Sequence, residues 1–320
     1  MVYIWCYMIV TINIMTKFTL ILMLIFSNMI FVNKIDKLNT TKEVIEFVKT
    51  VHPEYGIVKY KDFKYGIFDI ESIDSIYNQL KCKGIFKIDK IKNWQKIDVN
   101  NDGLTDLIFI SHFYGYIQNV IIDEGKNGFK LIRNIINFDE CEYIKPIKVQ
   151  DKNELRIRKV NLPFDFDDNI EKYIKVDTLT YKYDSFIELN DKAIIDSKIK
   201  FVEFKTNLCF GICPVYKLTI NKNGQAEFIG IELTNFKGKS RKQLNQKSVD
   251  EIFNMLNYIE VTKLNDYYEV NYTDAQTVTL DMFFENGTVK KIKDYGLSGT
   301  YGLSALYSKL TKLGTETEWK

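Results

Sequence analysis

The feature that most constrains this chain is a pair of cysteines, Cys209 and Cys213, that enclose a glycine and precede a proline. Gly211 permits a tight turn between them because it has no Cβ atom. Pro214 fixes its own φ angle immediately before the next segment. Residues 215–220 then alternate apolar and polar side chains, which is the pattern of a half-buried strand. We therefore expect a short closed loop that leads into the first strand of a β-hairpin.

Four states are open for the two cysteines. A disulfide would pin the loop, and its stabilising effect would be about 2 kcal/mol or less because it closes so few residues. Reactive thiols are a second alternative, although redox-active pairs usually have two intervening residues and this pair has three. A metal site is a third, but the sequence has no histidine or second cysteine pair nearby. Two free buried thiols are the fourth, and we expect the disulfide.

The composition indicates a folded protein with room for two domains. The chain has 320 residues, of which 46% are hydrophobic and 27% charged, a balance typical of globular proteins. Its formal net charge of +2 argues against nucleic acid as a partner. The two histidines, His52 and His112, lie outside any recognisable nucleophile motif, so we do not expect a Ser-His-Asp triad.

Residues 1–34 predict export. Residues 1–32 are nearly all apolar, and Met15 offers a second possible start with Lys17 before the apolar run. The segment is either a signal peptide or an uncleaved anchor, because it is marginally long enough to span a bilayer. Both alternatives place the rest of the chain in the periplasm, the envelope or the medium. A membrane contact is then expected only through this segment, if it is retained.

The other cysteines are compatible with such an oxidising compartment. If Cys6 is absent from the exported chain, four cysteines remain, and the simplest second pair joins Cys82 to Cys141. Four cysteines allow three connectivities, between which the sequence does not choose.

Residues 35–192 predict a β-rich first domain. Helices are expected at residues 41–51, with Thr40 or Thr41 as the cap, and at residues 72–80. Strands are expected at residues 107–110, 116–123, 129–136, 143–149, 154–159, 178–183 and 186–189. The boundary with the second domain is placed at residues 190–192.

One stretch of this domain has the spacing of a calcium loop. Oxygen donors stand at positions one, three, five, seven and nine, where position seven is a backbone carbonyl: Asp98, Asn100, Asp102, Leu104 and Asp106. Gly103 occupies position six, where such a loop turns sharply. Position twelve is Phe109 instead of glutamate, so the loop is not an EF-hand. The alternative to bound Ca²⁺ is an Asx-rich hairpin turn without a metal ion.

This stretch resembles the calcium loop of FG-GAP/VCBS-type repeats, in which an Asp-rich loop joins two strands. The chain shows no second copy of the motif. A β-propeller needs several blades, so that fold is not expected. The resemblance implies one structural Ca²⁺ ion as the cofactor.

Residues 193–320 predict a second domain of the order β-β-β-α-β-β-α. Its strands are expected at residues 199–205, 215–220, 225–231, 277–284 and 288–292. Its helices are expected at residues 247–258, capped by Ser248, and at residues 303–313. Both domains are therefore expected to be antiparallel β-sheets with helices packed on one face, which is the α+β class.

The region from Lys198 to Trp319 resembles a family known as domain of unknown function 6438. The resemblance rests on Cys209-Phe210-Gly211-Ile212-Cys213-Pro214-Val215-Tyr216, Asn223-Gly224, Asp266-Tyr267-Tyr268, Tyr272-Thr273-Asp274 and Asp294-Tyr295-Gly296. It implies a bacterial and often exported domain with no established activity. Many relatives carry a lipoprotein cysteine after the leader, which this chain lacks.

Two classes of function follow from these observations. The leading expectation is a non-enzymatic envelope protein whose disulfide-pinned loop meets a protein or a cell-surface ligand. The alternative is an enzyme, either a hydrolase or a thiol–disulfide exchange protein, with a site near the two cysteines and Asp274. The candidate functional surface consists of Tyr216, Tyr267, Asp274 and Asp294.

Overall fold

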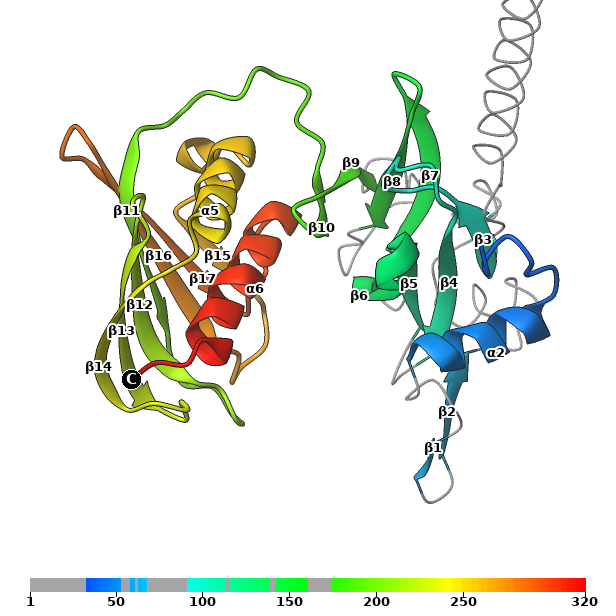
Figure 1. The fold of residues 1–320 in the computed structure, drawn as a ribbon, viewed down its shortest axis with the longest axis horizontal. Coiled ribbons are helices and arrows are strands. Elements are labelled where there is room, and N and C mark those ends of the chain that lie inside the picture. Colours follow the sequence, from blue (N-terminus) through cyan, green and yellow to red (C-terminus); the bar gives the residue numbers. More distant parts are fainter. Residues whose placement is uncertain are drawn as a thin grey trace, which may run out of the picture.

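The computed structural model describes residues 33–52, 58–60, 63–67, 91–112, 116–137, 142–160 and 174–320. The leader or anchor, the helix expected at residues 72–80 and the pair Cys82–Cys141 lie outside these ranges. Within them the protein has three β-sheets and three α-helices, which confirms the α+β class (Figure 1). None of the helices in these ranges has the length and apolar character needed to cross a membrane.

The first sheet is antiparallel and is built around the apolar strand β4 (Asp106–His112). Beyond β4 the order continues through β5 (Tyr116–Asp123) to β6 (Phe129–Asn137), with η2 (Gly125–Asn127) between these two strands. On the other side, β2 (Phe63–Ile67) and β3 (Trp94–Ile97) pair with different parts of β4, and β1 (Val58–Tyr60) pairs with β2.

Helix α2 (Thr41–Val51) covers one face of this sheet. Thr40, one of the two caps that the sequence predicted, forms a capping box with Glu43. Val44, Phe47 and Val48 pack against Leu107, Phe109 and Ile121 of the sheet. The helix ends at Val51, as the sequence predicted.

A second sheet lies against the other face. Its order is β10 (Ser185–Glu188), β9 (Ile174–Lys182), β8 (Lys152–Val160) and β7 (Tyr143–Val149), all antiparallel. Ile108 of β4 packs against this sheet, whereas its neighbours Leu107 and Phe109 face α2. Side chains alternate along a strand, so a strand covered on both faces needs the continuous apolar run seen in β4. The first region therefore contains two sheets where the sequence predicted one.

The third sheet has seven strands. Its order is β14 (Gly238–Gln243), β13 (Gln225–Glu232), β12 (Val215–Asn221), β11 (Ile199–Thr206), β16 (Thr277–Phe284), β17 (Val289–Tyr295) and β15 (Tyr267–Glu269). Only β15 and β17 pair in parallel. Helices α5 (Gln246–Tyr258) and α6 (Tyr301–Glu316) cover one face (Figure 1), and η5 (Val261–Lys263) follows α5.

The two edge strands of this sheet were not predicted. Strand β14 reads Gly-Lys-Ser-Arg-Lys-Gln and lacks apolar alternation, because a charged edge strand needs little apolar surface and resists unwanted pairing. Strand β15 has only three residues. The cap of α5 was also placed wrongly: Asn245, rather than Ser248, accepts the N–H of Lys247.

Candidate binding surface

The cysteine loop joins β11 to β12 and is closed by the Cys209–Cys213 disulfide, with a Cα–Cα distance of 5.7 Å. The structural disulfide predicted for this pair is confirmed. Gly211 adopts a φ angle of +144° at the turn, where a side chain would be strained.

Hydrogen bonds fix the base of the loop. The Thr206 hydroxyl donates to the Pro214 carbonyl at 2.7 Å and accepts the N–H of Tyr216 at 3.1 Å. The Gln276 side chain donates to the carbonyls of Asn207 and Pro214 at 3.1 and 3.4 Å. These bonds tie the two ends of the loop to each other and to the start of β16, independently of the disulfide.

The tip of the loop, residues 208–213, is apolar and exposed. Phe210 is 88% exposed, Ile212 90% and Leu208 56%. No residue from 207 to 215 carries a charged side chain. One hydrogen bond, from the Phe210 N–H to the Asp274 carbonyl at 3.0 Å, ties the tip to the neighbouring turn. Single exposed apolar residues are common in soluble proteins, but a group of them marks an interaction site.

Further exposed apolar side chains gather at the same end of the sheet. Val215 pairs with Glu232 and Thr206 pairs with Val278, so the strand ends beside the loop lie level with one another. Six of the eleven large hydrophobic residues that are exposed in the described ranges belong to this end: Leu208, Phe210, Ile212, Ile231, Leu233 and Tyr272. We call these six residues the apolar end.

A shallow groove of about 620 Å³ runs beside the loop. Its lining comes from the loop, with Leu208, Phe210 and Val215, and from the neighbouring strands and turn, with Asp274, Ala275, Thr277 and Tyr295. Its lining includes one carboxylate, that of Asp274, and one phenol, that of Tyr295, which accepts the N–H of Ala275 at 3.2 Å.

Two residues of the predicted functional surface are exposed. Tyr267 is 49% exposed on β15, and its hydroxyl donates to Glu269 at 2.7 Å. Asp274 is exposed in the turn before β16, with a φ angle of +69° that aspartate tolerates better than most residues. Of the two, Asp274 lines the groove beside the cysteine loop.

The other two, Tyr216 and Asp294, are buried, which corrects the prediction. Tyr216 is 1% exposed and lies between Phe228 and Gly314, where a Cβ atom on the glycine would come within 2.5 Å of its ring. Asp294 is fully buried and accepts the N–H groups of Ser298 and Gly299 at 2.8 and 3.0 Å. Burial raises the pKa of Asp294, and these hydrogen bonds oppose the rise. Both residues support the core and the turn before α6.

The loop at residues 98–106 is polar and folded on itself. The side-chain oxygens of Asp98 and Asn100 both accept the N–H of Asp102 at 3.1 Å. Asp98 also accepts the N–H of Gly103 at 2.9 Å, and Asp102 accepts that of Leu104 at 2.8 Å. Gly103 has a φ angle of +88°, which is the sharp turn that the sequence pattern requires.

Asp106 ties this loop to the sheet. Its carboxylate is fully buried and accepts the N–H groups of Val99 and Asp123, each at 2.8 Å. Burial raises the pKa of Asp106 to about 7, the two hydrogen bonds oppose the rise, and the charges of Asp102 and Asp98 add to it. In the part of the chain that the structure describes, no group of three or more His, Cys, Asp or Glu side chains is gathered to hold a metal ion.

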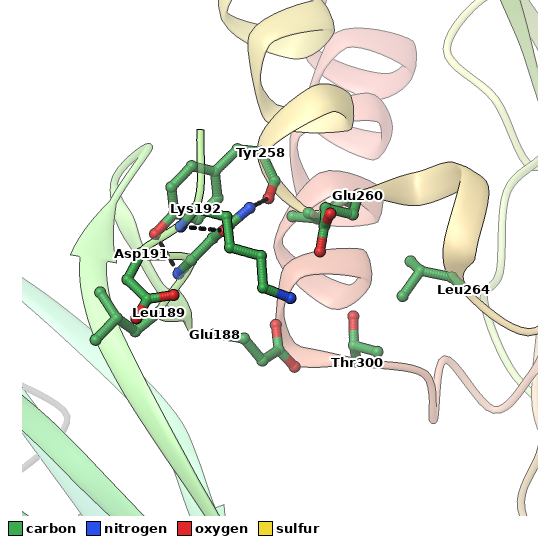
Figure 2. Close-up of a pocket in the computed structure, with 10 residues that line it drawn as sticks. Glu188, Leu189, Asp191, Lys192, Tyr258, Glu260, Leu264 and Thr300 are labelled. Atoms are coloured by element: carbon green, nitrogen blue, oxygen red, sulfur yellow. Dashed lines mark hydrogen bonds between the residues drawn. The ribbon is translucent and has the colours of Figure 1, made fainter. Parts of the chain in front are cut away.

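A second hollow, of about 220 Å³, lies between the end of β10 and the ends of α5 and α6 (Figure 2). Glu188 of β10 accepts the N–H groups of Tyr301 and Gly302, at the start of α6, at 2.7 and 2.8 Å. Asn190 donates from its backbone to the Tyr258 hydroxyl at 3.0 Å and from its side chain to the Tyr258 carbonyl at 2.7 Å. Glu188 and Asn190 thus join the two parts of the molecule at this hollow. Sequence patterns gave no sign of these contacts.

Comparison with known proteins adds one finding. No curated protein and no solved structure matches the chain. The model of a family described as a domain of unknown function, DUF6438, matches residues 200–314, a range that includes the cysteine loop and the whole apolar end but not the loop at residues 98–106. This match supports the resemblance of the C-terminal region to the family that its sequence predicted.

Proposed function

We propose that this protein is an exported, non-enzymatic binding module that meets a protein or a cell-surface ligand through its apolar end. The observation that carries the proposal is the exposure of Phe210 and Ile212 on a loop closed by a disulfide. Burying each side chain in a complex would contribute about 2 kcal/mol. A loop already held in one conformation also loses little entropy on binding.

Export is supported by two features. A disulfide persists in oxidising compartments outside the cytosol, and residues 1–32 have the apolar composition of a leader or anchor. The hydrolase alternative finds no support in the groove, where Asp274 and Tyr295 are the only titratable side chains in its lining.

The binding proposal is tested by retention of envelope components on the immobilised protein. Phe210→Ser should abolish the retention of a component that the wild-type protein holds. Val289→Ser is the matched control, because Val289 is 53% exposed at the opposite end of the same sheet. Equal retention by the wild-type protein, Phe210→Ser and Val289→Ser would contradict the proposal.

We further propose that the loop at residues 98–106 takes up one structural Ca²⁺ ion. The donor set supports this: carboxylate, amide and carbonyl oxygens suit a hard cation. In the described conformation these oxygens bond to backbone N–H groups of the loop itself, so binding would have to compete with those bonds. Titration of Ca²⁺ in a melting experiment should raise the melting temperature of the wild-type protein but not of Asp102→Ala. An unchanged wild-type melting temperature would contradict the proposal.

A further inference from the structure

The tip and the base of the cysteine loop are held by different bonds. At the base, the Asn207 N–H donates to the Thr277 carbonyl at 3.0 Å. This bond and those of the Thr206 and Gln276 side chains do not involve the disulfide. At the tip, Phe210 and Ile212 are too exposed to be held by packing. The tip is therefore held by the disulfide and by the bond from Phe210 to Asp274.

The bridge is also separate from the core of its domain. The buried cluster around Phe204, Leu218 and Phe228 contains neither cysteine and none of the tip residues. The ring closed by the bridge spans a sequence separation of four, and a ring this short constrains the unfolded chain far less than a long one does. Opening the bridge should thus free the tip and leave the domain folded.

Both cysteines are partly exposed, so a reductant can reach them. We propose that the Cys209–Cys213 bridge is a thiol-sensitive latch, which an external dithiol opens to release the tip from its binding conformation. This inference rests on the proposed function, because it concerns the regulation of the same surface. It differs from catalysis of thiol exchange, since the bridge is the target of the reaction.

The reaction is an ordinary thiol–disulfide exchange. One thiolate of the dithiol attacks a sulfur of the bridge, and a mixed disulfide forms as the other cysteine leaves as a thiolate. The second thiolate of the reductant then attacks the mixed disulfide. Two electrons pass from the dithiol to the bridge, so Cys209 and Cys213 become thiols and the reductant leaves as a disulfide.

The test compares two amide protons in the full-length protein. The Phe210 amide lies in the tip, and the Asn207 amide lies in the base of the same loop. With excess dithiothreitol under native conditions, the hydrogen-exchange protection of Phe210 should fall about tenfold, while that of Asn207 stays the same. The double variant Cys209→Ser/Cys213→Ser should reproduce this result without reductant.

Two results would overturn the latch: a bridge that resists dithiothreitol until the protein is unfolded, or a Phe210 amide that stays protected after reduction. If the double variant does not fold, reduction of the wild-type protein alone decides the question. The outcome is independent of the proposed function, because no partner is present. The two proposals can fail separately. If reduction frees the tip but Phe210→Ser leaves the retention of envelope components unchanged, the proposed binding surface is contradicted and the latch is not.

Discussion

The loop at residues 98–106 and the cysteine loop both join β-strands, and each is held in a single conformation by different chemistry. The first uses carboxylates that accept backbone N–H groups, and it ends on the buried Asp106. The second uses a covalent bridge and leaves its apolar tip in solvent. The first loop is thus tied into the fold, whereas the tip of the second lies outside the buried cluster of its domain.

The largest effect is expected from Asp106→Ala. The substitution leaves the N–H groups of Val99 and Asp123 without an acceptor inside the protein, and buried unsatisfied groups are costly. We expect a loss of about 3 kcal/mol in the free energy of unfolding, measured in urea. Asp106→Asn keeps one oxygen acceptor, so its free energy of unfolding should fall by less. A loss smaller than the one caused by removing the disulfide would contradict the structural role of Asp106.

The same residue should make stability depend on pH. The pKa of Asp106 is raised from 3.8 to about 7 by burial, so the folded state favours the protonated carboxyl. Its contribution is complete below the unfolded value of 3.8 and is lost as the pH rises through about 7. In the absence of Ca²⁺, the free energy of unfolding should fall over this range in the wild-type protein, and the fall should be smaller in Asp106→Asn. If the free energy of unfolding falls equally with pH in the wild-type protein and in Asp106→Asn, Asp106 is not the group responsible.

A smaller effect is expected from removing the bridge. Cys209→Ser/Cys213→Ser should lower the free energy of unfolding by about 2 kcal/mol or less, because the closed ring is short. Near-ultraviolet circular dichroism should show that the aromatic core around Phe204 and Phe228 is intact. Loss of that signal would show that the bridge supports the whole domain and not only the tip.

The smallest effect on stability is expected from Phe210→Ser and Ile212→Ser. Each side chain is almost fully exposed, so its replacement should change the free energy of unfolding by about 0.5 kcal/mol or less. Phe228→Ser should destabilise far more, because Phe228 is buried on the neighbouring hairpin and stacks on Trp319 at 4.8 Å. Destabilisation of similar size in all three variants would mean that the tip packs against the protein.

Sequence patterns predicted the parts of the fold in which one face is apolar. The ends of α2 and of β16 follow from such patterns, whereas β14 has none, because it lies at a charged edge. The role of Tyr216 could have been predicted correctly. On β12 it lies on the same face as Leu218 and Ile220, and that face of the strand is buried in the core.

The candidate site could be predicted only in part. The motif located the cysteine loop and its disulfide, because Gly211 permits a tight turn between the cysteines and Pro214 fixes its φ angle before the strand. The apolar end could not be foreseen, because Ile231, Leu233 and Tyr272 are brought beside the loop by strand register. The junction made by Glu188 and Asn190 depends on contacts between residues far apart in the chain.

The most direct test of the central claim is photo-crosslinking in the exporting cell, with a photoreactive residue placed at position 210 or, in a matched protein, at position 289. Both positions are exposed, and they lie at opposite ends of the third sheet. The account predicts a discrete adduct from position 210 that is absent from position 289 and that disappears when Ile212→Ser is added. The same adducts from both positions, or none from position 210, would contradict it.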